Sequence, residues 1–190
     1  MGLTKYKLGS LIEYCDCRNN EDNYGIDAVM GISTGKELII TKANMDGVSL
    51  SSYKLVKSSE FSYVADTSRR GDKIAIAFND TKKTFIISSI YTVFKVKRKD
   101  LLDSRFLFMF FNRPEFDRYA RFNSWGSARE TFNFDDMCDV EIPIPDITIQ
   151  RSIANIYEVY VERKEINERL KEQIRDLCPI LIKGSIDEAS

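Results

Sequence analysis

The chain has 190 residues, of which 43% are hydrophobic and 12% aromatic, a composition that suits one globular domain with an appendage and argues against disorder. It contains no histidine, which removes the commonest acid–base residue, the usual metal ligand and the histidine-dependent catalytic triads and dyads. The net charge of −1 hides a basic middle, because residues 54–129 carry sixteen Lys/Arg and eight Asp/Glu, whereas residues 130–190 carry seven and fourteen. This division predicts a polyanion-binding face and a separate protein-contacting element.

The cysteines and the N-terminus further limit the kinds of site and the cellular location that the sequence allows. Cys15-Asp16-Cys17 is not a C-x-x-C motif and no second pair stands at zinc-site spacing, so we interpret the four cysteines as free thiols. No apolar run reaches the ~18 residues of a membrane span, and the N-terminus lacks a signal-peptide pattern. We therefore expect a soluble cytoplasmic protein that needs no metal or cofactor and contacts no membrane.

The first half of the chain reads as short strands separated by turns. Segments 27–33 and 36–41 are predicted strands on either side of a glycine-serine turn, and segment 53–66 has strand character with a break at Ser58-Ser59. Residues 73–78 and the β-branched and aromatic run 84–97 predict a hairpin with a basic tip at Lys82-Lys83.

Helical periodicity begins after residue 100. Leu102, Phe106, Met109 and Phe110 recur at i, i+4, i+7 and i+8, and Pro114 either breaks this helix or begins a second one. A short strand at 140–142 is expected to end at Pro143. These elements indicate an α/β (α+β) globular domain with a mixed sheet over residues 1–147.

The last segment, 148–183, predicts a long coiled-coil helix, followed by a tail at 184–190. Its seam has strict 4-3 spacing. The seam residues are Ile149, Ile153, Ile156, Tyr160, Arg163, Asn167, Leu170, Ile174, Leu177 and Leu181. If two copies pair antiparallel about position 165, every apolar position faces an apolar one and Arg163 faces Asn167, whereas a parallel pair would stack Arg163 on itself. The pattern therefore favours antiparallel self-association or a similar antiparallel partner; the alternative is a single helix packed on its own domain. Pro179 is expected to kink or fray its last turn.

Several segments, taken in order, carry a family resemblance. They are LGSLIE at 8–13, GIST at 31–34 with a following lysine, SSIYTVFKV at 88–96, RPEFDRYAR at 113–121, GSARETFNFDDMCDVEIPIP at 126–145, and QRSIANI at 150–156. In combination they resemble the DNA specificity subunit of type I restriction–modification systems over about residues 5–183. That family places a target-recognition domain before a long helix, usually twice in tandem, and the two helices form an antiparallel coiled coil.

The resemblance implies a non-catalytic role and specific partners. Double-stranded DNA would be the ligand, methyltransferase subunits carrying S-adenosylmethionine would bind the helix and the 134–145 region, and a restriction subunit would join through them. This chain has one unit, so the implied form is a half-subunit that dimerises, or a truncated product. A helix of ~34 residues is ~50 Å long, which separates two domains by ~1.5 DNA turns. A homodimer would then read a palindromic bipartite target with an unread spacer.

The candidate DNA contacts come from the basic middle and its polar turns, since Lys and Arg meet phosphates and loop side chains read base edges. They are Lys36, Arg69, Arg70, Asn79, Lys82, Lys83, Arg121, Ser124 and Arg129. No catalytic residue is assigned. Two other functions stay open: a methyltransferase-binding decoy of the same fold without specific DNA binding, and a stand-alone enzyme, which the missing histidines, phosphate loop and metal cluster disfavour.

The segment NSWGSARETFNF at 123–134 has two interpretations. It contains the single tryptophan of the chain. In the first, Gly126 permits a tight turn, Trp125 packs over it and Arg129 pairs with an acid. In the second, Ser124, Trp125 and Arg129 lie at the rim that faces DNA. The two differ in whether Arg129 faces a phosphate or an internal carboxylate.

Overall fold

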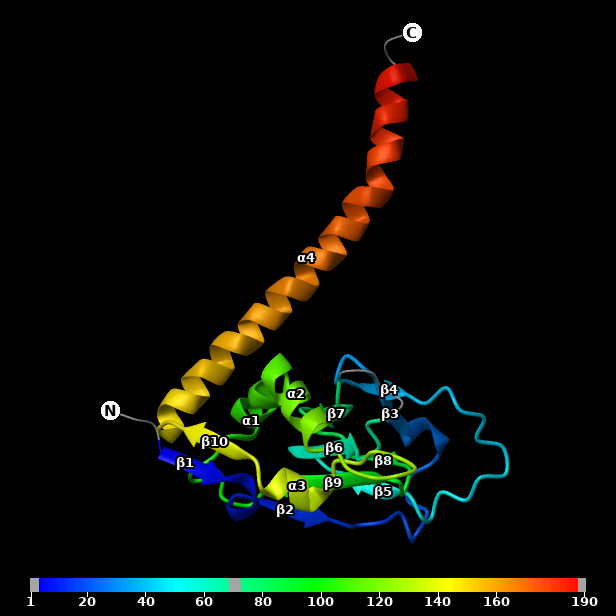
Figure 1. The fold of residues 1–190 in the computed structure, drawn as a ribbon. Helices are drawn as coiled ribbons and strands as arrows, with labels where there is room; N and C mark the ends of the chain where they lie inside the picture. Colours follow the sequence, from blue (N-terminus) through cyan, green and yellow to red (C-terminus); the bar gives the residue numbers. More distant parts are fainter. Residues whose placement is uncertain (1–3, 69–72, 188–190) are drawn as a thin grey trace. The chain divides into compact units, whose positions relative to one another are not determined.

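A four-stranded antiparallel sheet forms the centre of the fold (Figure 1). The computed structural model describes residues 4–68 and 73–187, with side chains as far as Pro179. The sheet has the order β2-β9-β6-β7. Its strands are β2 (Ile12–Cys15), β9 (Tyr91–Val96), β6 (Glu60–Val64) and β7 (Ile76–Phe78). Together with the helices, this sheet confirms the predicted α+β domain followed by a long C-terminal helix.

Three two-stranded antiparallel sheets surround the central one. They pair β1 (Thr4–Lys7) with β10 (Glu141–Ile144), β3 (Met30–Ile32) with β4 (Leu38–Ile40), and β5 (Lys54–Val56) with β8 (Phe85–Ile87). A parallel bridge joins Val29 to Ile86. Short 3-10 helices, η1 (Leu8–Ser10) and η2 (Ile26–Ala28), precede β2 and β3.

Both faces of the central sheet are covered, which is why all five residues of β6 are buried. Alternate side chains of a strand point to opposite faces. On one face, Phe61 packs on Phe94 at a centroid distance of 5.0 Å and on Phe111 at 5.7 Å, and these rings belong to the largest core cluster. On the other, Val64 joins a second cluster that contains Val56 of β5 and Ile87 of β8.

The three helices of the globular part begin at clear sequence signals. Asp103 caps α1 (Ser104–Phe111) by accepting hydrogen bonds from the backbone N–H groups of Arg105 and Phe106. Pro114 opens α2 (Pro114–Phe122), so the proline begins a second helix. A capping box between Asn133 and Asp136 starts α3 (Phe134–Cys138).

The predicted hairpin at 73–97 is wrong in its pairing. β7 pairs with β6, whereas β8 pairs with β5 and β9 lies between β2 and β6. The run 84–97 is divided by a turn in which the Tyr91 N–H donates to the Ser88 carbonyl at 3.0 Å. Each half then buries its apolar residues against a strand distant in sequence, a choice that local pattern does not specify.

The last strand also differs from its predicted end, because β10 continues through Pro143, which pairs with Lys5. A two-stranded sheet has only edge strands, where a residue without an N–H is tolerated.

The final helix, α4, runs from Ile147 to Asp187 and continues past Pro179. The Asp146 side chain accepts the Thr148 N–H at 2.8 Å at its start. The chain forms two compact units, Met1–Arg151 and Ser152–Ser190, so the first turn of α4 belongs to the globular unit. Within the described ranges, no helix is both long and apolar enough to cross a membrane.

Candidate nucleic-acid interface

Lys36 lies inside the fold, which corrects its prediction as a DNA contact. Its side chain is 5% exposed, and its Nζ atom lies 2.8 Å from Asp117 Oδ1 and donates to the Phe111 carbonyl. Desolvation lowers the pKa of Lys36, and the charge and hydrogen bond of Asp117 oppose that shift. The lysine therefore connects the β3–β4 turn to α1 and α2, and it has no access to a phosphate.

Asn79 and Ser124 are buried too, and both are corrected for the same reason. The Asn79 amide donates to the carbonyls of Val56 and Lys83 at 3.0 and 2.8 Å, so it shapes the turn after β7. The Ser124 hydroxyl donates to the Ala120 carbonyl at 2.7 Å and closes the end of α2. Each polar group is engaged inside the protein and is not available to read a base.

The remaining described candidates separate into two groups. Lys82 and Lys83 are exposed in the turn after β7, and this turn adjoins the start of β6, because the Asn79 N–H donates to the Glu60 carbonyl at 2.9 Å. The loop that contains Arg129 adjoins the other end of β6, since the Phe132 N–H donates to Ala65 at 2.9 Å. The two groups thus lie at opposite ends of one strand. Arg69 and Arg70 lie outside the described residues.

Arg121 and Arg129 make ion pairs near the C-terminal end of β6. The Arg121 guanidinium lies 2.6 Å from Glu130 Oε2 and donates to the Thr67 carbonyl at 3.2 Å. Arg129 lies 3.9 Å from Asp66 Oδ2, and 64% of its side chain is exposed. The contact with an acid expected in the first interpretation is present, yet a long, exposed pair of this kind contributes little energy and leaves the guanidinium accessible.

The loop between Trp125 and Thr131, which we call the tryptophan loop, is a small closed hairpin. The backbone groups of Trp125 and Thr131 exchange two hydrogen bonds, of 3.1 and 3.0 Å. Gly126 has φ +146°, and a Cβ atom placed there would lie 2.0 Å from the Arg129 carbonyl oxygen. Glycine is therefore required by both conformation and space, as the tight-turn interpretation expected.

Two large aromatic side chains, one in the tryptophan loop and one just before it, are exposed. Trp125 is 67% exposed, and Phe122 at the end of α2 is 79% exposed. The expectation that Trp125 packs over the turn is wrong, because its side chain faces solvent.

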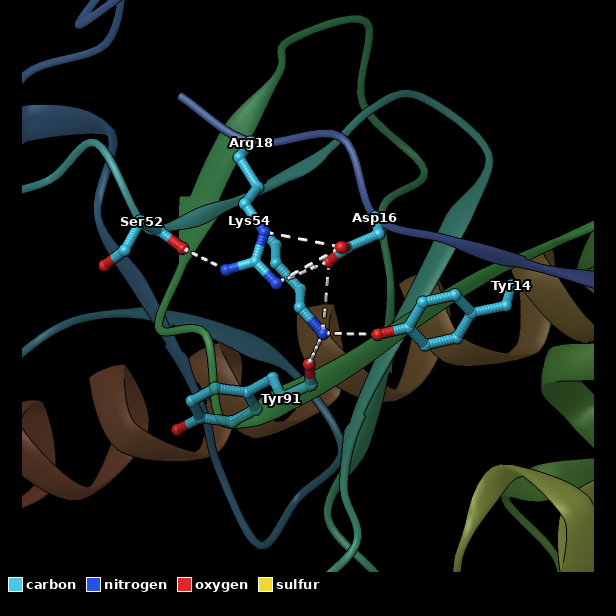
Figure 2. Close-up of polar contacts among 6 residues, drawn as sticks. All are labelled: Tyr14, Asp16, Arg18, Ser52, Lys54 and Tyr91. Atoms are coloured by element: carbon cyan, nitrogen blue, oxygen red, sulfur yellow. Dashed lines mark hydrogen bonds and ion pairs between the residues drawn. The ribbon is translucent and has the colours of Figure 1, made fainter. Parts of the chain in front are cut away.

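Lys54, which the sequence analysis did not name as a candidate, joins the ends of three strands. Lys54 Nζ donates to the Tyr14 hydroxyl at 2.7 Å and to the Tyr91 carbonyl at 2.9 Å, and Asp16 Oδ1 lies 3.7 Å away (Figure 2). Arg18 binds the same carboxylate at 2.9 Å and the Ser52 carbonyl at 3.1 Å. With 6% of its side chain exposed, Lys54 joins β2, β5 and β9 and has no exposed donor surface.

Gln150, in the first turn of α4, is another residue that sequence reasoning left without a role. Its side chain is fully buried; it accepts the Asp103 N–H at 3.0 Å and donates to the carbonyls of Leu101 and Pro145 at 2.7 and 2.8 Å. A buried glutamine with three partners ties residues 101–103 and Pro145 to the first turn of α4 within the globular unit. The signal available in the sequence was a polar residue at the start of the helix, inside the quoted QRSIANI segment.

A surface hollow of about 510 Å³ lies elsewhere on the globular unit, between β1 and the α1–α2 junction. Its apolar lining includes Phe110, Phe116 and Tyr119, and its rim carries the Lys7–Asp139 pair at 2.8 Å. None of the candidate DNA contacts that the structure describes lines it.

The predicted seam of α4 is largely solvent-exposed where it is described. Its apolar side chains between Ile149 and Leu177 are 36–71% exposed, and Arg163 and Asn167 are exposed as well. The side chain of Leu181 lies outside the described residues. A helix with such a row of exposed isoleucine and leucine side chains has an apolar face that another helix can cover.

The sequence matches the family described as "Type I restriction modification DNA specificity domain" over residues 3–176. The chain belongs to this family. A search of curated proteins gave no match.

Solved structures with a similar fold come from the same systems. The HsdS subunit from Thermoanaerobacter tengcongensis is 19% identical, with a TM-score of 0.68 over 98% of this chain and 49% of that one. A chain from a structure titled for complex assembly and conformational transition of the type I R-M system is 20% identical, with a TM-score of 0.63 and coverage of 99% and 49%. The S subunit from M. genitalium is 18% identical, with a TM-score of 0.57 and coverage of 93% and 44%. This chain therefore spans about half the length of the structures it matches.

Proposed function

We propose that this chain is a sequence-specific DNA-binding half-subunit of a type I restriction–modification complex. The observation that carries the proposal is the tryptophan loop, which holds an accessible arginine next to Arg121 in a chain of the DNA specificity family. Arginine is the side chain best suited to bind phosphates and guanine edges, because its guanidinium donates in a planar fork.

Two surfaces at opposite ends of β6 suit contacts along a duplex. Arg121 and Arg129 lie at one end, and Lys82 and Lys83 lie at the other. A strand of five residues spans ~17 Å, about half a turn of DNA. We assign phosphate contacts to both groups and base reading to the tryptophan loop, since phosphate contacts set register and base contacts specify sequence.

The second half of the recognition unit is supplied by another copy of this chain. The seam on α4 is exposed, and antiparallel pairing about position 165 brings Ile156 opposite Ile174 and Arg163 opposite Asn167. The coverage of about half of each similar structure agrees with a chain that reaches full size by pairing. A symmetric dimer would place two identical domains in inverted orientation, so its target is a palindrome with an unread spacer.

Catalysis belongs to the partners in this proposal. The chain directs methyltransferase subunits, which bind the helix and the 134–145 region, and a restriction subunit joins through them. Its own residues bind and orient DNA, and no acid, base or nucleophile is assigned to it.

Methylome sequencing with this gene present and absent tests the proposal. The expected result is a palindromic bipartite motif that is methylated only when the gene is present. DNA affinity measured together with the methyltransferase separates this function from a decoy. Equal affinity for the motif and for a scrambled duplex would reject specific recognition and favour the decoy.

A further inference from the structure

Two aromatic side chains at or beside the tryptophan loop leave most of their surface in solvent. Phe122 is 79% exposed and Trp125, three residues later, is 67% exposed. Large aromatic side chains bury most of their surface in an ordinary domain, because each removes some 150–250 Å² from water. Two of them exposed within four residues indicate a contact surface.

The backbone beneath Trp125 is held rigidly, which distinguishes it from a residue on a flexible loop. Two backbone hydrogen bonds join Trp125 to Thr131, and the Thr131 hydroxyl donates to the Trp125 carbonyl at 3.3 Å. On the N-terminal side, the Ser124 hydroxyl is anchored to α2. Because the backbone is already fixed, less conformational entropy is lost when the side chain binds, so the geometry suits recognition.

Arginines near Phe122 and Trp125 favour an anionic ligand over an apolar protein surface, because Arg118 and Arg129 stay largely exposed although each has an acidic partner, Glu115 and Asp66. Arg121 is paired more closely, with Glu130 at 2.6 Å. Arg118 and Arg121 lie on the same last turns of α2 as Phe122, and Arg129 lies on the same loop as Trp125. Arg118 and Arg129 are 72% and 64% exposed. Cationic side chains beside exposed apolar rings suit a DNA surface, where the cations bind phosphates and the rings make apolar contacts with base edges.

We propose that Trp125 contacts a base edge in a groove of the DNA target directly, through the apolar surface of its indole ring. The inference rests on the proposed function and adds the residue that contributes apolar base recognition. Arg121 and Arg129 hold the flanking phosphates, so the aromatic contact adds to specificity and the arginines add to affinity for any duplex.

Trp125 is the single tryptophan of the chain, so its environment can be followed by itself. The full chain is labelled with 5-hydroxytryptophan, which absorbs at longer wavelengths than ordinary tryptophan, and is assembled with unlabelled methyltransferase. The complex is titrated with a duplex that carries the methylated motif and with a scrambled duplex. Affinity is measured in parallel from the anisotropy of a dye on the DNA, for wild type, Trp125→Ala, Trp125→Phe and the control Ile40→Ala, which removes an exposed isoleucine from β4.

The expected result is quenching of Trp125 emission by the motif duplex and a loss of about tenfold or more in affinity for that duplex in Trp125→Ala. Trp125→Phe retains part of the affinity, Ile40→Ala retains all of it, and binding of the scrambled duplex is nearly unchanged. Wild-type affinity in Trp125→Ala with unquenched emission would overturn the inference and leave the proposed function intact. Loss of methyltransferase from Trp125→Ala complexes would also overturn it, because the surface would then bind protein. Failure of the wild-type complex to prefer its motif would reject the proposed function itself.

Discussion

The side-chain amide of Gln150 accepts a hydrogen bond from the backbone N–H of Asp103 at 3.0 Å, and Asp103 is the residue that caps α1. One buried side chain therefore links the first turn of α4 to the start of another helix. Its amide also satisfies the carbonyls of Leu101 and Pro145, so three backbone groups depend on a single residue.

Replacement of Gln150 by alanine should lower the free energy of unfolding of the globular unit by about 2–4 kcal/mol, because it leaves buried backbone groups without partners. Urea denaturation followed by circular dichroism measures the change. Gln173→Ala removes an exposed glutamine from the same helix and should stay within about 0.5 kcal/mol of wild type. An equal effect of the two variants would contradict the role given to Gln150.

Gly126→Ala should reshape the tryptophan loop. The new methyl group would collide with the Arg129 carbonyl oxygen, and φ +146° strains any residue with a Cβ. We expect a loss of at least about 1–2 kcal/mol in unfolding free energy together with weaker DNA binding. Gly35→Ala is the control, since the nearest atom to its Cβ is 3.4 Å away. A fully stable Gly126→Ala protein with normal DNA affinity would show that the loop conformation is not needed.

Arg129→Ala should weaken binding to motif and scrambled duplexes by similar factors. Loss of one phosphate contact reduces the slope of log affinity against log salt by about 1. Anisotropy titrations at several salt concentrations give that slope. Arg98→Ala serves as the control, because Arg98 is half-exposed and paired with Asp100 outside the proposed surface. If Arg98→Ala changes the slope as much as Arg129→Ala, the surface has been assigned to the wrong part of the domain.

A charge exchange on α4 tests both the existence and the direction of the dimer. In antiparallel pairing about position 165, Ile156 of one chain faces Ile174 of the other. Ile156→Glu and Ile174→Lys should each weaken dimerisation, because each places a charge against an apolar partner. The double variant pairs Glu with Lys in both layers and should recover dimer mass by light scattering.

A parallel dimer gives the opposite result for the double variant, since each charge would then face its own copy. A wild-type chain that stays monomeric at micromolar concentration would reject the homodimer outright. Asn167→Leu adds a test of the polar layers, because it should change the register or the number of chains in the assembly.

Stability at alkaline pH should depend on Cys15. Burial, and next the charge of Glu60, raise the pKa of its thiol from 9.0 to about 12. Because the folded state holds this proton more tightly than the unfolded state, the stabilisation is complete below pH 9 and is lost as the pH rises toward 12. Thermal unfolding between pH 8 and pH 11 should therefore show a shallower decline for Cys15→Val than for wild type, at a maximum of about 1.4 kcal/mol per pH unit. Parallel declines would contradict this contribution.

Local patterns predicted the positions of α1, α2 and α4, but they did not predict α3, and α4 continues to Asp187 beyond the expected end at residue 183. Pro114 begins α2 because a missing N–H costs nothing at a first helical position, and the 4-3 spacing after residue 148 lies on a helix from Ile147 to Asp187. The positions of strands β3 to β10 were also predicted, because β-branched and aromatic runs favour strands, whereas β1 and β2 were not. The partners of β8 and β9 could not be predicted from local pattern, because both strands pair with segments distant along the chain.

Individual contacts depended on tertiary packing. Lys36 and Arg129 both follow small residues in polar turns and look alike in the sequence, yet the first is buried against Asp117 and the second is exposed. The difference arises because the docking of α2 brings a carboxylate over the β3–β4 turn, whereas the tryptophan loop projects from the end of the sheet. The order of residues was enough to establish the family, the basic middle and the helical seam, since these are local properties of the chain. Tertiary packing determined which cationic side chains reach solvent, and it also left Trp125 exposed.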